Sequence, residues 1–135
     1  MVAIENNITF LESIDLGYAS VHLRSDGILL INTVDNHLFT GEESRAITEA
    51  LGTVSGGIAR PVLKVAGKYS SADESARIYT ASPEGLRYTL ADAVLINSMA
   101  QRIIGNFYLQ VNKPSKPTRL FTSREDAIKW LKTFL

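Results

Sequence analysis

The chain has 135 residues, 45% of them hydrophobic, which is enough for one core and too few for two ordinary domains, so we expect a single domain over residues 1–135. It contains no cysteine, which excludes disulfide frameworks and cysteine-based metal or redox sites. The 14 basic and 14 acidic residues give a net charge of zero. Proteins that bind single-stranded nucleic acid interleave basic residues with exposed aromatics, and the basic residues near the C-terminus do not show this pattern, so we expect no nucleic-acid partner.

The first predicted element is a β-hairpin. Two runs rich in β-branched and apolar residues, Tyr18–Arg24 and Ile28–Val34, flank the turn signal Ser25-Asp26-Gly27. The preceding segment, Ile8–Leu11, is either a short strand or an ordered tail, because its pattern is too brief to choose between the two.

A helix followed by a buried strand comes next. Thr40 and Glu43 form a capping box at the helix start, and Gly56-Gly57 ends the helix. Its apolar residues recur at helical spacing: Ile47, Ala50, Leu51 and Val54. After Pro61, the apolar run Val62–Ala66 is typical of a buried strand, which completes a βαβ unit.

The middle of the chain repeats this alternation. Ser71 with Glu74 predicts a second helix start, and the helix carries Ala72, Ala76 and Tyr79 on one side. Ser82-Pro83-Glu84-Gly85 interrupts that helix, because proline cannot continue it. Tyr88–Ile96 follows as a strand, although Ala91, Asp92 and Ala93 weaken its β propensity.

The last third predicts a long amphipathic helix over Ser98–Val111. At 100° per residue, one broad half of this helix is apolar and is expected to face the core: Met99, Ala100, Ile103, Ile104, Phe107, Tyr108 and Val111. Pro114 and Pro117 bracket a turn before the short strand Thr118–Phe121. Ser123 with Asp126 then caps a final helix whose apolar side holds Ala127, Trp130, Leu131 and Phe134.

Together these elements predict an α/β fold. Strands that alternate with helices form a mixed, largely parallel sheet, here of 4–5 strands with about four helices and right-handed crossovers. Residues 1–10 lack the basic start and apolar run of a secretory signal, and no stretch approaches the roughly 18 apolar residues of a membrane span. We therefore expect a cytoplasmic protein without a membrane span.

Charge is unevenly spread along the chain. Residues 1–50 hold two basic and eight acidic groups, whereas residues 93–135 hold seven basic and two acidic groups. This indicates either a basic surface for an anionic partner or attraction between elements distant in sequence. The net charge of zero favours the second interpretation.

Three motifs carry a resemblance to a known family. They are Leu23-Arg24-Ser25-Asp26-Gly27-Ile28, then Asn106-Phe107-Tyr108-Leu109 with Asn112-Lys113-Pro114, and Leu120-Phe121-Thr122-Ser123 leading to Ala127-Ile128-Lys129-Trp130-Leu131. With the order of elements, they make the chain resemble the STAS, or SpoIIAA-like, fold, and most closely a group of small bacterial single-domain proteins of unassigned function. The resemblance implies a SpoIIAA-like sandwich that regulates through protein contacts and does not catalyse.

The same resemblance points to a regulatory serine. Anti-sigma-factor antagonists are phosphorylated in an Asp-Ser-Ser/Thr-Gly motif at a helix start, and Tyr69-Ser70-Ser71-Ala72 occupies the matching place. Both Ser70 and Ser71 are retained, but the acid and the glycine are absent. Asp73 and Glu74 would repel a phosphate there, so an N-cap role for Ser71 is the simpler interpretation.

Gly105 is the one anomaly in the long helix. Glycine inside a helix costs about 1 kcal/mol relative to alanine, and this one projects opposite the expected core face, so something should approach it closely. Arg102 and Leu109 lie on the same side, and the three predict a surface for a protein partner or for self-association. The alternative is a local kink or a loop that passes over the helix.

Catalysis finds little support in the sequence. His22 and His37 have no metal-ligand spacing, Gly52–Gly57 lacks the lysine of a phosphate loop, and the paired acids are explained by helix starts. We expect no cofactor and a non-enzymatic regulatory or interaction domain. The alternative is a module for a small apolar or anionic ligand, which an internal pocket would favour, and an enzyme would have to gather His37 with distant acids.

Overall fold

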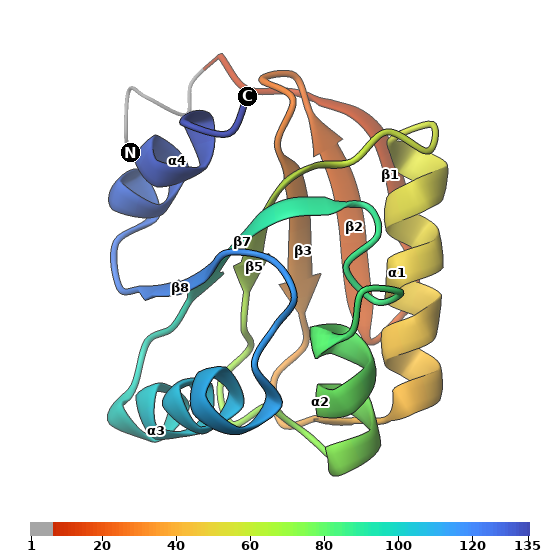
Figure 1. The fold of residues 1–135 in the computed structure, drawn as a ribbon. Helices are drawn as coiled ribbons and strands as arrows, with labels where there is room; N and C mark the ends of the chain where they lie inside the picture. The colour runs from red at the N-terminus through yellow and green to blue at the C-terminus, as the bar shows by residue number, and fades with distance from the viewer. Residues whose placement is uncertain (1–6) are drawn as a thin grey trace.

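A six-stranded mixed sheet forms the centre of the protein (Figure 1). The computed structural model describes residues 7–135. In the sheet the strands are ordered β1 (Phe10–Asp15), β2 (Ala19–Arg24), β3 (Leu29–Thr33), β5 (Arg60–Val65), β7 (Thr89–Leu95) and β8 (Thr118–Phe121). The pairs β1–β2 and β2–β3 are antiparallel, whereas β3–β5, β5–β7 and β7–β8 are parallel. The predicted α/β class with a mixed, largely parallel sheet is therefore confirmed.

One strand more than expected joins the sheet. Of the segment Ile8–Leu11, for which a strand and a tail are both open in the sequence, Phe10 and Leu11 belong to β1, which runs on to Asp15 at the edge of the sheet. Its register shifts between Phe10 and Glu12. A separate two-stranded parallel sheet joins β4 (Leu38–Phe39) to β6 (Ser71–Ala72). The prediction that the chain lacks a secretory signal concerns residues 1–10, and residues 1–6 of this segment lie outside the described part.

In the described part of the chain, four α-helices flank the sheet: α1 (Gly41–Val54), α2 (Glu74–Ala81), α3 (Met99–Phe107) and α4 (Arg124–Lys132). The capping box at Thr40 and the cap at Ser123 form as predicted, since each side chain accepts from the backbone N–H three residues on. No helix within residues 7–135 has both the length and the apolar content to cross a bilayer.

The start of α2 corrects the predicted cap. Asp73, not Ser71, is its N-cap, and the Asp73 carboxylate accepts from the Ala76 N–H at 2.8 Å. Ser71 is extended because it pairs with Leu38 in the small sheet, so the helix starts later than predicted. Since aspartate caps helices as well as serine does, the sequence pattern could not separate the two.

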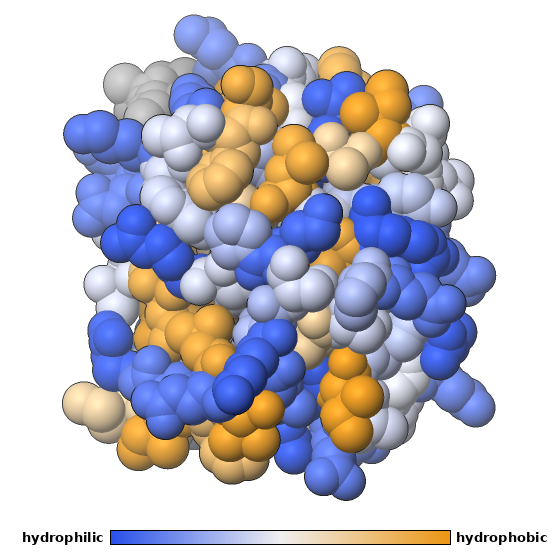
Figure 2. Space-filling model, in the orientation of Figure 1, coloured by the Kyte–Doolittle hydropathy of each residue, from blue (hydrophilic) through white to orange (hydrophobic). Residues whose placement is uncertain are grey.

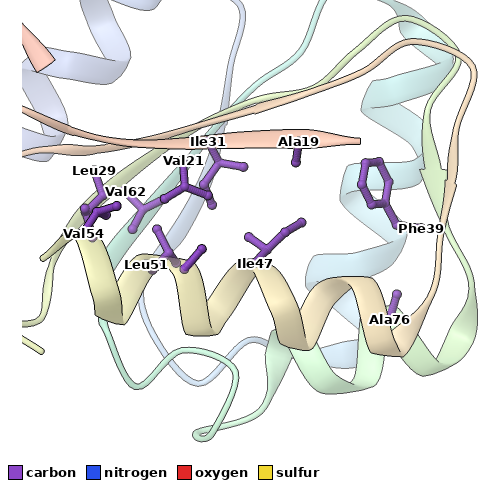
Figure 3. Packing of buried hydrophobic residues seen from close by; sticks show 11 residues of the cluster. Ala19, Val21, Leu29, Ile31, Phe39, Ile47, Leu51, Val54, Val62 and Ala76 are labelled. Atoms are coloured by element: carbon purple, nitrogen blue, oxygen red, sulfur yellow. The ribbon is translucent and has the colours of Figure 1, made fainter. Parts of the chain in front are cut away.

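Each face of the large sheet carries its own apolar cluster, because neighbouring residues of a strand point to opposite faces. On one face α4 packs on β5 and β7, and Leu63 lies with Ile128 and Leu131. On the other face α1 packs on β2, and Val62 lies with Ile47 and Leu51 (Figure 3). Figure 1 shows α4 on one side of the sheet and α1 and α2 on the other.

The predicted core face of the long helix is wrong. The helix has the expected extent, as α3 followed by a π-helical turn over Tyr108–Asn112, but Met99 is 69% exposed and Ile103 is 64% exposed. The buried residue of α3 is Gln101. Helical periodicity identifies an apolar stripe but not the surface it faces. Here the part of the stripe that carries Met99, Ile103, Phe107 and Val111 turns outward.

Candidate functional site

A pocket of about 160 Å³ lies between the α1 face of the sheet and the helices α1, α2 and α3. Mostly apolar side chains line it: Ile31, Ile47, Leu51, Val62, Val94, Ile104 and Leu120. They come from four strands and from two of the covering helices, so the pocket is a gap in packing between the two layers. Small-molecule sites are typically concave and mainly apolar with a few polar groups, which makes the pocket a candidate binding site.

Charged and polar groups enter this apolar pocket from three elements. Lys64 comes from β5 and Asp92 from β7, and both point to the α1 face because Asp92 is in register with Val62, two residues before Lys64. Arg77 comes from α2, and Tyr108 from the turn that follows α3. These four side chains give the pocket a polar part.

Asp92 is the most unusual of the four. Asp92 is only 5% exposed, and its Oδ1 has no hydrogen-bond partner among residues 7–135. Burial raises the pKa of this carboxyl to about 6, and the positive charge of Lys64 only partly opposes the shift. An ionisable group kept in an apolar interior without a partner is a common mark of a functional site.

The Tyr108 hydroxyl is buried in the same pocket. It too is without a partner in the described part of the chain. Burial raises the pKa of Tyr108 well above its ordinary value, and the negative charge of Asp92 adds to the rise. Tyr108 therefore stays protonated, and its hydroxyl and the Asp92 carboxylate are close enough to interact electrostatically.

Polar side chains also hold α2 and α3 over the pocket. Arg77 donates from Nη1 to the Ala72 carbonyl at 2.6 Å, and its guanidinium lies 5.3 Å from the ring centre of Phe107. Gln101 donates to the Gly67 carbonyl at 2.8 Å and accepts from the Asn97 N–H at 2.8 Å. The buried Gln101 thus ties the start of α3 to the loop after β5.

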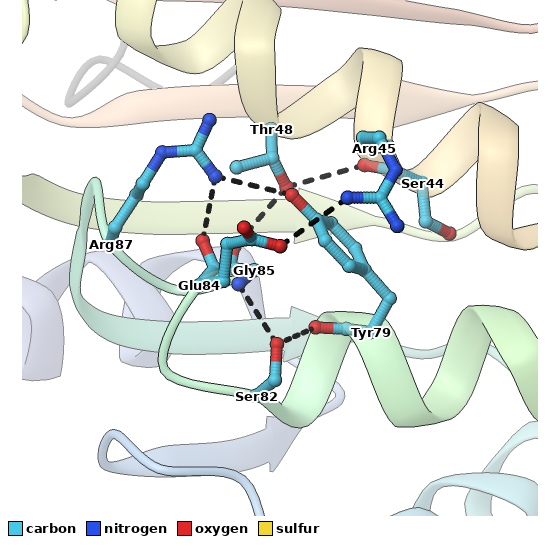
Figure 4. A network of polar contacts seen from close by, with 8 residues as sticks. All are labelled: Ser44, Arg45, Thr48, Tyr79, Ser82, Glu84, Gly85 and Arg87. Carbon is cyan, nitrogen blue, oxygen red and sulfur yellow. Dashed lines mark hydrogen bonds and ion pairs between the residues drawn. The ribbon is translucent and has the colours of Figure 1, made fainter.

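A hydrogen-bond network closes the pocket where α1 meets the turn after α2 (Figure 4). Thr48 donates to the Gly85 carbonyl at 3.1 Å, and the Gly85 N–H donates to Ser82 Oγ at 3.0 Å. Arg87 donates to the Tyr79 hydroxyl at 3.1 Å, while the Arg45 guanidinium lies 4.4 Å from the Tyr79 ring centre. Thr48 and Gly85 both line the pocket, so this network fixes part of its wall.

The two candidate regulatory serines also border the pocket. Ser70 Oγ donates to the Gly67 carbonyl at 2.7 Å, and the Ser71 N–H donates to the His37 carbonyl at 2.9 Å. Because Asp73 caps α2, its carboxylate already occupies the helix N-terminus that a phosphate on Ser71 would need. Phosphorylation of either serine stays a prediction.

The predicted surface of Arg102, Gly105 and Leu109 does not form one open patch. A close neighbour of Gly105 was expected and exists: a Cβ on Gly105 would lie 2.8 Å from both terminal carbons of Leu120 on β8. Gly105 therefore faces the protein and borders the pocket, while Arg102 is exposed and Leu109 half-buried. The placement of Gly105 outside was wrong because the helix lies rotated from its expected orientation. A partner contact by Arg102 or Leu109 stays a prediction.

The two histidines lie outside the pocket lining. His22 hydrogen-bonds to Ser13 Oγ at 2.7 Å and to Ser20 Oγ at 3.0 Å, and burial lowers its pKa despite the nearby Asp15. His37 Nε2 lies 3.0 Å from both carboxylate oxygens of Glu43, at the start of α1. Across residues 7–135, no cluster of three or more His, Asp or Glu side chains is arranged to hold a metal ion.

Sequence reasoning missed Lys64, Asp92 and Tyr108 as site residues. A usable signal was present, because Asp92 interrupts an otherwise apolar predicted strand, and a charge inside a buried strand needs a reason. The interpretation of Asp92 as a weak point in β propensity leaves this signal unused. Tyr108 carried no such signal, since it belonged to the stripe that was assigned to the core.

A family model described as "Domain of unknown function (DUF7793)" matches residues 21–135. The chain belongs to this family. No curated protein matches it. Among solved structures, it is similar to an uncharacterised DUF3478-family protein with a SpoIIAA-like fold from Shewanella loihica PV-4. That protein is 15% identical, with a TM-score of 0.54 over 92% of this chain and 93% of the other. The likeness shows the fold alone, and it confirms the SpoIIAA-like fold expected from sequence.

Proposed function

We propose that this protein is a non-enzymatic module of SpoIIAA-like fold that binds a small, mainly apolar ligand in the pocket under α1, α2 and α3. The observation that carries the proposal is a pocket of about 160 Å³ that holds the buried, unpaired carboxylate of Asp92. A closed core would have favoured the role of a pure docking domain. In a typical small-molecule site, apolar walls supply the binding energy and a few polar groups fix the orientation of the ligand.

The size of the pocket limits the ligand. An engineered apolar cavity of about 150 Å³ holds one benzene molecule, so a pocket of about 160 Å³ suits a compact body of roughly that size. A non-enzymatic role is supported by the arrangement of the polar groups. No described residue donates a hydrogen bond to Asp92 Oδ1, so this oxygen has no nucleophile to activate. Neither His22 nor His37 lines the pocket.

Filling the pocket should abolish binding. Val94 lines the pocket on the same strand as Asp92, and we expect Val94→Phe to occupy the space that a ligand needs. Methylcyclohexane added to labelled wild-type protein should shift the amide NMR signals of lining residues such as Ile104 and Leu120. The shifts should be absent in Val94→Phe.

Two further variants make this test decisive. Leu90→Phe introduces the same phenyl ring at an exposed position of β7 outside the pocket, and this variant should bind methylcyclohexane as the wild type does. Ala66→Leu fills the pocket from another element, should Val94→Phe prove unstable by circular dichroism. Wild-type spectra that do not change with methylcyclohexane would remove the proposal.

A second candidate is the regulatory interaction role expected from sequence. It is favoured by the outward apolar stripe of α3, which Figure 2 shows as apolar surface at the lower left, where α3 lies in Figure 1. In a two-fold dimer, the same patch of each subunit meets across the interface. An uncharged apolar stripe can therefore pack against the stripe of a second subunit, whereas a patch of one charge would repel its counterpart. A second copy of the chain is therefore the occupant that we propose for this stripe.

Self-association through α3 predicts a change of mass in one variant. Ile103→Lys puts a charge in the centre of the stripe, so wild-type protein should be dimeric by light scattering and Ile103→Lys monomeric. Ile58→Lys introduces the same charge at another exposed isoleucine, outside α3, and should leave the dimer intact. A wild-type protein that stays monomeric at every concentration would remove this candidate.

A further inference from the structure

The polar part of the pocket holds three buried polar atoms that lack hydrogen-bond partners among the described residues: Arg77 Nε, Asp92 Oδ1 and the Tyr108 hydroxyl. The Arg77 guanidinium is already held by the Ala72 carbonyl and the Phe107 ring, so Asp92 and Tyr108 are the two side chains whose polar groups a ligand has to satisfy. A buried polar group without a partner destabilises the folded state by the full loss of its hydration. A ligand that supplies partners to both groups recovers this free energy on binding, whereas a purely apolar ligand does not.

The charges that face the pocket restrict the polar group of the ligand. A carboxylate or phosphate placed beside Asp92 would meet a like charge in an apolar interior. An ammonium group would face Asp92 but also Lys64 and Arg77, which line the same pocket. The mixture of one acidic and two basic side chains therefore favours an uncharged polar group.

The hydrogen-bond roles of Asp92 and Tyr108 restrict it further. An ionised carboxylate only accepts hydrogen bonds, so Asp92 needs a donor. A phenol both donates and accepts, so Tyr108 can donate to the ligand. A carbonyl or an ether oxygen has no proton to give to Asp92. A hydroxyl group has one proton to donate and lone pairs to accept, and it matches both partners at once.

We infer that the ligand is a compact apolar alcohol whose hydroxyl donates to the Asp92 carboxylate and accepts from the Tyr108 hydroxyl. This inference rests on the proposed ligand-binding function and adds the chemical class of the ligand. The apolar body lies against the walls formed by Val62, Val94 and Ile104. Water could satisfy the same two groups, but water would give the pocket no preference between an alcohol and a hydrocarbon of the same shape.

A pair of probes with the same shape tests the inference. Cyclohexanol and methylcyclohexane differ by a hydroxyl in place of a methyl group. Their dissociation constants are measured by NMR titration for the wild type, Asp92→Leu and Tyr108→Phe. The ratio of the two constants in each protein reports the hydroxyl interaction, because differences in hydrophobicity between the probes are common to all proteins.

The dissociation constant of cyclohexanol divided by that of methylcyclohexane should rise by about tenfold or more in Asp92→Leu. A site built around a hydroxyl rejects the analogue that lacks it, and this preference is lost when Asp92 is replaced. Tyr108→Phe should raise the same ratio by about threefold, the size of a weak neutral hydrogen bond. Glu49→Leu removes an exposed carboxylate on α1, outside the pocket lining, and should keep the wild-type ratio.

The possible failures are distinguishable. If both probes bind and their ratio is the same in all four proteins, the hydroxyl inference is overturned and the proposed ligand-binding function stands. If neither probe binds the wild type, the proposed function falls and the inference falls with it. Circular dichroism of Asp92→Leu and Tyr108→Phe confirms folding, and loss of selectivity in either folded variant supports the inference.

Discussion

Replacing Asp92 with asparagine should stabilise the protein at pH 7.5 by up to about 3 kcal/mol, although the substitution removes a charge from the proposed ligand site. Burial raises the pKa of Asp92 from its ordinary 3.8 to about 6 in the folded protein. The folded state therefore binds a proton more tightly than the unfolded state does. Ionising Asp92 inside the fold costs free energy, and asparagine avoids that cost.

The sign of the pH dependence follows from the same shift. As the pH rises from about 4 to above 6, the unfolded chain releases the Asp92 proton first, so the free energy of unfolding of the wild type falls over this window. Asp92→Asn should lose this part of the pH dependence. The other charged or titratable groups that face the pocket are Lys64, Arg77 and Tyr108.

Urea unfolding at pH 4.5 and pH 7.5 measures the effect. Asp92→Asn should exceed the wild type at pH 7.5, and at pH 4.5, which is still above the ordinary pKa of 3.8, this advantage should fall to about a third. Glu49→Gln neutralises an exposed carboxylate of α1 and should change stability little at either pH. Equal stability of Asp92→Asn and wild type at both values would show that the Asp92 carboxyl is not held in an apolar interior.

A single methyl group on Gly85 should destabilise the protein by about 3 kcal/mol, near the upper end of the usual cost of overpacking. A Cβ at this position would lie 2.0 Å from the Tyr79 carbonyl oxygen, which is backbone and cannot rotate away. Relief requires the turn after α2 to move. That movement breaks the Thr48 bond to the Gly85 carbonyl and loosens the wall of the pocket.

Gly85→Ala is compared with Gly57→Ala by thermal unfolding. Gly57 has a φ of +82°, and a Cβ there would meet open space, so its replacement costs only the strain of a left-handed backbone, about 1 kcal/mol. Gly85→Ala should lower the melting temperature clearly more than Gly57→Ala. Equal losses in the two variants would mean that the turn accommodates the methyl group and does not fix the pocket wall.

The parts of the fold that the sequence predicted well depend on local rules. The capping box of Thr40 and Glu43 needs only residues close in sequence, and α1 begins where it was placed. The alternation of Val62 and Leu63 between the two faces follows from strand geometry alone. The order of strands and helices then fixed the α/β class, which the comparison of structures supports.

The candidate site was not predictable in the same way, because it depends on the orientation of α3. The periodicity of Met99, Ile103 and Phe107 is strong, yet the side of the helix that faces the sheet carries Gln101 and Gly105. Close approach at glycine and one buried amide outweighed the apolar stripe. Tyr108 and Asp92 meet in the pocket only once α3 has this orientation, so no local pattern could pair them.

The margins of the large sheet bear on how the protein resists aggregation. A strand at a sheet margin invites another chain to add to it, unless the strand is short, charged, broken by proline or irregular. At one margin β8 has four residues, follows Pro117 and carries Arg119. At the other, the register of β1 shifts between Phe10 and Glu12, which disrupts a regular template. Fibril-like growth by strand addition is therefore disfavoured at both ends of the sheet.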